Sequence, residues 1–368
     1  MPRVLMTADT VGGVWTYAVE LARELEKRGV RVGIATMGAE LSPHQREEVA
    51  GSRRITLFES AYRLEWMADC GADVEAAGEW LMELERVFQP DIVHLNQFAF
   101  GALPFQAPTL LVAHSCVLSW WRTVRGEVAP AEWDVYRGWV MAGLAGADLV
   151  AAPTRAMLDS LAGNYGVARS GLVLPNGASG EDFAPARKQP VVLAAGRFWD
   201  AAKNLRALER VAPDLPWPVR VAGACKQPGG GTVAPVGVEC LGELSRQALA
   251  REFATAAIYA LPARYEPFGL SVLEAALSGC ALVLGDVASL REVWGEAAVY
   301  VAPDDHAALR SALLRLAGSP AERARMGQAA RTRARRYTPV RKCDAYLAAY
   351  ARLVPRFSAA GSEELACA

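Results

Sequence analysis

The strongest constraint on the fold is an alternation of two sequence patterns along the chain. Short apolar runs of strand length alternate with longer segments whose apolar residues recur at helical spacing. Residues 3–8 predict a strand, residues 14–28 a helix that ends at Gly29, and residues 31–37 a second strand. Such strand–helix–strand units form parallel, doubly wound sheets, so the chain is predicted to be an α/β protein.

The series occurs twice, and a Pro- and Gly-rich passage separates the two halves. A chain of 368 residues with 52% hydrophobic content can build two domains, each with its own core. We expect a first domain over 1–177, a linker over 178–190 and a second domain over 191–336. A helix is expected over 337–357, and a tail over 358–368 is expected to be disordered.

Charge and cysteine content exclude several classes of function. A net charge of -1 gives no electrostatic reason to bind nucleic acid. Seven cysteines without a C-x-x-C pair suit a reducing compartment better than a disulfide framework. The N-terminus has no signal-peptide apolar region, and no run of 18 apolar residues occurs. We therefore expect a cytoplasmic protein.

One stretch, EPFGLSVLE, carries the clearest functional signal. Glu266 follows a buried apolar run that predicts a strand, and Glu274 lies in the first turns of the helix that follows. Ligands of open α/β sheets bind at the carboxyl ends of strands. Gly269 lets the backbone approach a ligand, and the first helical amides favour an anion. Two carboxylates beside an anion site suggest that the ligand also carries hydroxyls, as a sugar nucleotide does.

A plainer interpretation is a helix start with two surface glutamates. The whole pattern, however, resembles the E-x7-E signature of the retaining family-4 glycosyltransferases, which have the GT-B fold. The resemblance implies two Rossmann-like domains facing a central cleft, the first binding the acceptor and the second the donor. The same resemblance implies that the helix over 337–357 crosses back to the first domain. It also implies that Glu266, Phe268, Gly269 and Leu270 hold the donor sugar and that Glu274 holds the ribose hydroxyls.

The resemblance extends to further donor residues. Arg197 and Lys203 match the family's G-R-x5-K pair, which implies that both bind the diphosphate. Without the resemblance, two solvated charges would be the default. Trp199 departs from the family's small aliphatic residue nearby. Leu244 occupies the loop that contacts the base in the family, and a P-N-G motif at Asn176 matches the family's hinge.

The loop after the first strand, TADTVGGVW, lacks the dinucleotide fingerprint G-x-G-x-x-G. Its paired glycines can still bring backbone amides to a phosphate, and the resemblance places Gly13 beside the donor diphosphate. The alternative is a tight turn packed against the other domain.

Two histidines end short buried strands, His94 within residues 92–95 and His114 after residues 109–113. A lone strand histidine is more often a packed residue than a catalyst. The family has a histidine near the reacting sugar at the position of His114, which makes it the better candidate, and His94 the weaker one. Trp120 and Trp121 are adjacent, so one of them is a candidate for the acceptor cleft.

The chain contains no D-x-D triplet, the carboxylate pair with which many transferases bridge Mg²⁺ to a diphosphate. We therefore expect no metal and no cofactor, with positive charge from Arg197, Lys203 and helix amides. Because Glu266 and Glu274 are both assigned to hydroxyls, neither serves as a covalent nucleophile. Front-face transfer follows, in which the leaving phosphate takes the acceptor's proton.

The function predicted is transfer of a hexose from UDP-glucose or a related UDP-sugar to a saccharide or lipid-linked acceptor, as in polysaccharide biosynthesis. One alternative is a GT-B-type sugar-nucleotide epimerase, and another is a non-catalytic sugar-nucleotide-binding subunit. An Arg-rich helix begins at Pro320. A solvated helix is the usual explanation for such a face, and docking on anionic lipid of the inner membrane is the alternative.

Overall fold

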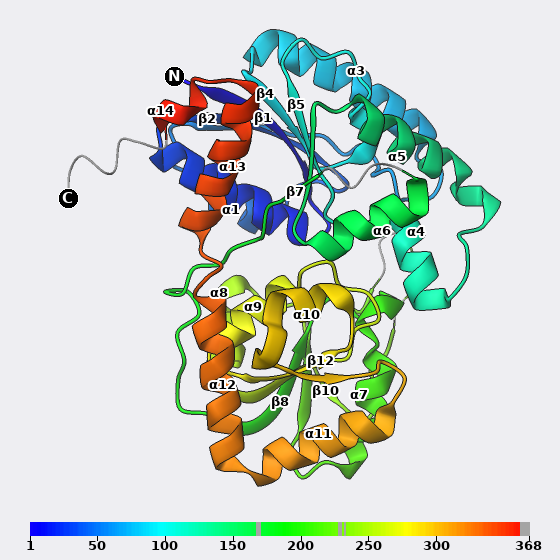
Figure 1. Ribbon diagram of the computed structural model, residues 1–368, viewed down its shortest axis with the longest axis vertical. Helices are drawn as coiled ribbons and strands as arrows, with labels where there is room; N and C mark the ends of the chain where they lie inside the picture. The colour runs from blue at the N-terminus through cyan, green and yellow to red at the C-terminus, as the bar shows by residue number, and fades with distance from the viewer. Residues whose placement is uncertain (167–170, 227–229, 232, 361–368) are drawn as a thin grey trace. The chain divides into compact units, whose positions relative to one another are not determined.

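The computed structural model describes residues 1–166, 171–226, 230–231 and 233–360. The chain forms two compact units (Figure 1). Unit 1 comprises Met1–Trp121, Glu127–Asn176 and the chain from Pro339 onward, and unit 2 comprises Arg122–Gly126 and Gly177–Thr338. Each unit contains one parallel sheet with helices around it, as the alternating sequence pattern predicts.

The sheet of unit 1 has seven parallel strands in the order β3-β2-β1-β4-β5-β6-β7. Their bounds are β1 (Arg3–Asp9), β2 (Arg31–Met37), β3 (Ile55–Phe58), β4 (Ile92–Leu95), β5 (Thr109–Val112), β6 (Leu149–Ala152) and β7 (Leu172–Val173). The helices are α1 (Gly13–Lys27), α2 (Pro43–Val49), α3 (Gly71–Phe88), α4 (Val117–Trp120), α5 (Asp134–Gly146), α6 (Arg155–Tyr165), α13 (Pro339–Leu353) and α14 (Phe357–Ala360).

Local sequence explains where the helices of unit 1 begin and end. Helix α1 buries the face that carries Ala18, Leu21 and Leu25, and the left-handed Gly29 follows its end. Thr154 caps α6 by accepting a hydrogen bond from the amide of Met157, as the sequence predicts. These local signals set where α1 ends and where α6 begins.

The C-terminal helix α13 belongs to unit 1 (Figure 1). Its Tyr346 and Tyr350 are fully buried in the core that α1 shares. The ammonium of Lys342 is buried as well, where it pairs with Glu20 at 2.8 Å and lies over the ring of Tyr17. Burial of this kind requires a partner for the charge, so α13 is held on α1 by both packing and an ion pair.

The sequence predicts a disordered tail from residue 358, but the ordered chain extends further. Helix α14 (Phe357–Ala360) includes the start of the predicted tail. Phe357 is fully buried and its ring lies 5.2 Å from that of Tyr350. Burial of this aromatic side chain orders the segment where the composition alone predicts disorder. The remainder of the predicted tail, 361–368, lies outside the described residues.

The sheet of unit 2 has six parallel strands in the order β10-β9-β8-β11-β12-β13. Their bounds are β8 (Gln189–Ala195), β9 (Val219–Ala222), β10 (Glu239–Gly242), β11 (Ala256–Leu261), β12 (Ala281–Gly285) and β13 (Val299–Val301). The helices are α7 (Leu205–Val211), α8 (Arg246–Thr255), α9 (Leu270–Leu277), α10 (Ala288–Trp294), α11 (His306–Gly318) and α12 (Pro320–Ala334).

The segment expected to be a linker, 178–190, packs onto unit 2 instead of bridging freely. Phe183 is 1% exposed and contacts Phe253, and the ammonium of Lys188 donates to the carbonyl oxygens of Phe253 and Ser278. Strand β8 also begins at Gln189, within the expected linker. A single buried aromatic residue among prolines and glycines was the only sequence signal for this packing.

Both sheets reverse their strand order at one place. In unit 1 the reversal lies between β1 and β4, and in unit 2 between β8 and β11. The carboxyl ends of two such strands diverge and leave a crevice, where ligands of open α/β sheets bind. The loops that follow β1, β4, β8 and β11 are therefore the places to look for a site.

Candidate active site

In unit 2, the ends of β8 and β11 bring together two residues that lie far apart in the sequence. Lys203 Nζ lies 2.5 Å from a carboxylate oxygen of Glu266. The two side chains are 14% and 11% exposed, so the pair is largely desolvated but still reachable. Both residues follow strands that flank the sheet's reversal point. The arrangement places one cation and one carboxylate at the expected ligand position.

The loop after β8 shapes the surroundings of Lys203. The methylenes of Lys203 pass over Gly196, where a Cβ would lie 3.6 Å from them. Arg197 stacks on the ring of Trp199, with its guanidinium carbon 5.3 Å from the centroid. A cation over an indole face is attracted by the ring's negative charge. Trp199, which departs from the family pattern, therefore supports one of the two predicted diphosphate ligands.

Asn204 is a structural residue of this loop that the sequence interpretation missed. Its backbone is left-handed, with φ of 55°, and its side-chain amide donates to the carbonyl oxygens of Pro262 and Pro303. Those bonds tie the loop after β8 to the loop after β11, and so fix Lys203 relative to Glu266. Asn is among the few residues that tolerate this conformation, and this was the available sequence signal.

The start of α9 forms the second side of the site. Gly269 has φ of 86°, a conformation that favours glycine, and it directly precedes the first helical residue, Leu270. Phe268 is 2% exposed and its ring packs against Tyr337, so its side chain belongs to the core of unit 2. The hydroxyl of Ser289 donates to the carbonyl oxygen of Glu266 and holds that residue's backbone in place.

Two predicted contacts of the nucleotide lie further along unit 2. Glu274 is half-buried on α9, one turn beyond Leu270. Leu244 follows β10 and is half-buried, directly before Ser245, which caps α8. Their places relative to the strand ends agree with a ligand that runs across the carboxyl edge of the sheet.

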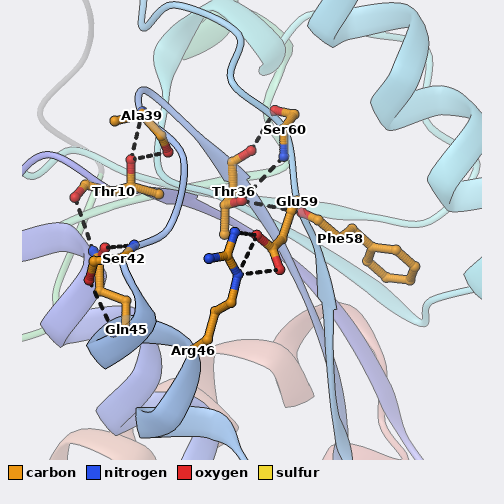
Figure 2. Close-up of polar contacts among 9 residues, drawn as sticks. All are labelled: Thr10, Thr36, Ala39, Ser42, Gln45, Arg46, Phe58, Glu59 and Ser60. Carbon is orange, nitrogen blue, oxygen red and sulfur yellow. Dashed lines mark hydrogen bonds and ion pairs between the residues drawn. The ribbon is translucent and has the colours of Figure 1, made fainter.

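In unit 1 the glycine-rich loop follows β1, and a network of polar contacts holds it (Figure 2). The hydroxyl of Thr10 accepts from the amide of Ala39 at 2.8 Å, and the side chain of Gln45 donates to the carbonyl oxygen of Thr10. Gln45 also completes a capping box with Ser42 at the start of α2. Thr10, the first residue of this loop, is thus hydrogen-bonded to α2.

Arg46 of α2 forms a bidentate ion pair with Glu59, the residue that follows β3, with a nitrogen–oxygen distance of 2.7 Å (Figure 2). Gly13 lies at the other end of the glycine-rich loop, where it is exposed and is the first residue of α1. The preceding Gly12 has no side chain to cap the helix, and its carbonyl oxygen accepts a hydrogen bond from the amide of Trp15. Gly13 lies at the very start of the helix, where the sequence predicts a contact between its backbone and a phosphate.

His114 follows β5, and Asn96 fixes its protonation. The amide nitrogen of Asn96 donates to the carbonyl oxygen of Thr7, which turns Asn96 Oδ1 toward His114 Nε2 at 2.8 Å. Because that oxygen only accepts, Nε2 must carry the proton and Nδ1 is left as an acceptor. Burial lowers the pKa of His114 to about 3, so the ring is neutral at physiological pH.

His94 proves to be the packed residue that the plainer interpretation describes. It is fully buried, its Nδ1 lies 2.6 Å from the hydroxyl of Tyr350, and its ring stacks on Tyr346. Burial lowers its pKa to about 3. His94 therefore links β4 to the C-terminal helix and is not exposed to a ligand.

Solved structures with the same fold include a sucrose-phosphate synthase and a protein solved with a sugar nucleotide. Sucrose-phosphate synthase from Thermosynechococcus elongatus superposes with a TM-score of 0.77 at 19% identity, over 97% of this chain and 100% of that one. The Anabaena protein Alr3699/HepE, solved in complex with UDP-glucose, gives a TM-score of 0.75 at 14% identity, over 96% and 100%. At these identities the likeness establishes the fold, which is GT-B with two Rossmann-like domains.

Sequence comparisons give the family. The family model of Glycosyltransferase Family 4 matches residues 11–179, and that of Glycosyl transferases group 1 matches residues 189–319. Glycogen synthase of Mycobacterium tuberculosis is 43% identical over 75 residues, which is 20% of this chain and only 18% of that relative. The chain belongs to the family-4 glycosyltransferases, as its E-x7-E motif predicts.

The described residues include no helix that is both long and apolar enough to cross a membrane. Two arginines of the basic helix α12 have roles within unit 2. Arg323 stacks over Trp217 at 4.8 Å, and Arg333 donates to the carbonyl oxygens of Val293 and Glu292. These two are therefore engaged in packing rather than left for a lipid surface.

Proposed function

We propose that this protein transfers a hexose from a UDP-sugar, UDP-glucose or a close relative, to a saccharide or lipid-linked acceptor, with retention of anomeric configuration. The observation that carries the proposal is the Lys203–Glu266 pair at the reversal point of the unit 2 sheet. A lone phosphate would be repelled by Glu266, and a neutral sugar would leave Lys203 unused. A sugar diphosphate satisfies both.

The division of roles follows from this charge pattern. Lys203 and Arg197 bind the diphosphate, and the amides at the start of α9 add partial positive charge. Glu266 accepts hydrogen bonds from sugar hydroxyls, and Glu274 from the ribose. Lys203 and Glu266 neutralise each other, so the donor replaces one polar partner by another and neither charge is left unpaired.

Transfer by the front-face route needs no carboxylate nucleophile. The bond between the anomeric carbon and the diphosphate oxygen breaks as the acceptor oxygen bonds to the same face, and the acceptor's proton passes to the leaving diphosphate. Lys203 and Arg197 stabilise the negative charge that develops on the leaving group. His114, neutral with Nδ1 as an acceptor, is proposed to hold a hydroxyl of the reacting sugar or acceptor.

Incubation of the enzyme with UDP-glucose and a panel of oligosaccharides tests the proposal, with release of UDP and the anomeric configuration of the product as readouts. We expect UDP release that depends on acceptor and an α-linked product from the α-linked donor. Activity should persist in a chelator such as EDTA. A β-linked product would contradict retention, and complete loss in the chelator that Mg²⁺ restores would contradict the metal-independent route.

A further inference from the structure

Two cysteines of unit 2 lie side by side at the edge of its sheet. Cys225, in the loop after β9, and Cys240, in β10, have their sulfur atoms 4.0 Å apart. Cys240 is exposed and Cys225 is half-buried. In a disulfide the sulfurs are about 2 Å apart, so a movement of about 2 Å would join them.

The other described cysteines differ in their surroundings. Cys70, Cys116, Cys280 and Cys343 are all buried. Burial raises the pKa of Cys225 to about 11, as it does that of Cys280, so the exposed Cys240 is the member of the pair that reacts first. Cys367 lies outside the described residues. Within the described chain, the pair at the sheet edge therefore combines access to solvent with a second thiol in reach.

We propose that Cys225 and Cys240 form a site of reversible disulfide formation, oxidised by small-molecule disulfides. The exposed thiolate of Cys240 attacks one sulfur of the small disulfide and releases the first small thiol. Cys225, deprotonated as it reacts, then attacks the sulfur of Cys240 and releases the second. The protein loses two protons and two electrons, and the small disulfide gains them as it becomes two small thiols. A small dithiol reverses the reaction.

The location of the pair gives the reaction a consequence for the donor site. The amide of Gly223 donates to the carbonyl oxygen of Gly242 at 2.7 Å, and the amide of Phe198 donates to that of Ala224 at 2.7 Å. The loop that carries Cys225 is therefore bonded both to the loop of Arg197 and to the strand end before Leu244. Gly223 also fits closely, since a Cβ there would lie 2.0 Å from the carbonyl oxygen of Gly196.

Backbone movement that closes the gap between the sulfurs displaces this loop or β10 from the arrangement that those hydrogen bonds maintain. Because both neighbours belong to the proposed nucleotide site, the disulfide form binds UDP several-fold more weakly than the dithiol form. This consequence rests on the proposed function, whereas formation of the disulfide does not.

The full-length protein is incubated with oxidised glutathione, quenched by alkylation, and analysed by intact mass and peptide mapping. We expect a species that has lost two hydrogens, with peptides containing Cys225 and Cys240 linked to each other. The Cys225→Ser variant should instead accumulate a glutathione adduct on Cys240. Cys367→Ser serves as the control and should oxidise as the unmodified protein does. Adducts without the internal link, or a link that contains Cys367, would overturn the proposal.

Calorimetric titration with UDP then compares the oxidised and reduced forms, and Cys225→Ser, which cannot close the link, is titrated before and after the same treatment. We expect weaker binding only in the protein that carries the link. Equal affinity of the linked and reduced forms refutes the effect on the nucleotide site. If UDP binds neither form, the proposed function fails while the mapped disulfide stands.

Discussion

Lys203 occupies the position where loss of one charge should matter most. The Lys203→Ala change removes the cation that faces the leaving diphosphate, and we expect turnover to fall at least about 100-fold, the range for loss of one such electrostatic contact. Glu266 loses its partner, which should cost about 1–2 kcal/mol of stability at this partly exposed pair.

The matched control is Arg310→Ala, which removes a cation of unit 2 from an exposed pair with Asp214. That variant should keep its activity and its melting temperature. Circular dichroism confirms that both variants are folded, and UDP release measures turnover. Near-normal turnover of Lys203→Ala would refute the charge assignment.

Substitutions of Glu266 and Glu274 should have different effects on ligand binding. Glu274→Ala removes the proposed ribose contact, so it should weaken UDP and UDP-glucose alike, by roughly tenfold for one hydrogen bond to a charged group. Glu266→Ala should leave UDP binding nearly intact and mainly impair transfer, because its proposed partners are hydroxyls of the sugar. Calorimetry with both ligands measures the difference. An equal loss of UDP affinity in the two variants is incompatible with this division of roles.

Asn96 should act on the reaction through His114. In Asn96→Asp a carboxylate replaces the neutral oxygen beside Nε2, which favours the protonated imidazole and raises the pKa of His114 from about 3. The acidic limb of the kcat/KM profile should therefore move to higher pH than in the unmodified enzyme. A pH profile of UDP release provides the measurement. An unchanged limb with lower activity throughout would assign Asn96 a merely structural role.

At the scale of elements, docking of α13 on unit 1 should depend on pH through His94. Burial lowers its pKa to about 3 in the folded protein, from the value of 6.5 that an unperturbed histidine has. The unfolded chain therefore binds a proton that the folded chain does not, and stability falls as pH falls below about 6.5, by up to about 1.4 kcal/mol per pH unit.

The His94→Gln variant tests this coupling, because glutamine does not titrate. Thermal unfolding of both proteins is followed between pH 7.5 and 5.5 with a probe of unit 1. The melting temperature of the variant, though lower at pH 7.5, should decline less steeply. Parallel declines would show that a group other than His94 carries the pH dependence.

The elements themselves could be predicted from local patterns, and the exceptions have physical causes. The caps at Thr154 and Ser245 depend on residues three positions apart, so the sequence contains the whole signal. The predictions for 178–190 and 358–360 differ from the structure because Phe183 and Phe357 are each buried by partners far away in the sequence. A single aromatic residue in a polar segment does not reveal such partners.

At the scale of the whole molecule, the family motifs predict which residues form the site but not the contacts between those residues. The sequence predicted that Lys203 and Glu266 serve one site, while their ion pair across 63 positions depends on the strand order of the sheet. The tie through Asn204 and the protonation of His114 depend on the same tertiary arrangement. Patterns of local spacing determine the fold class, whereas the electrostatics of the site emerge only when the strand ends meet.

The most direct test of the central claim is calorimetric titration of the unmodified protein with UDP-glucose, GDP-mannose and ADP-glucose, with Lys203→Ala and Arg310→Ala in parallel. The account predicts saturable binding of UDP-glucose to the unmodified protein and Arg310→Ala, and at least tenfold weaker binding to Lys203→Ala. Binding of UDP-glucose that is unaffected by Lys203→Ala, or no binding of any of the three nucleotide sugars, would contradict it.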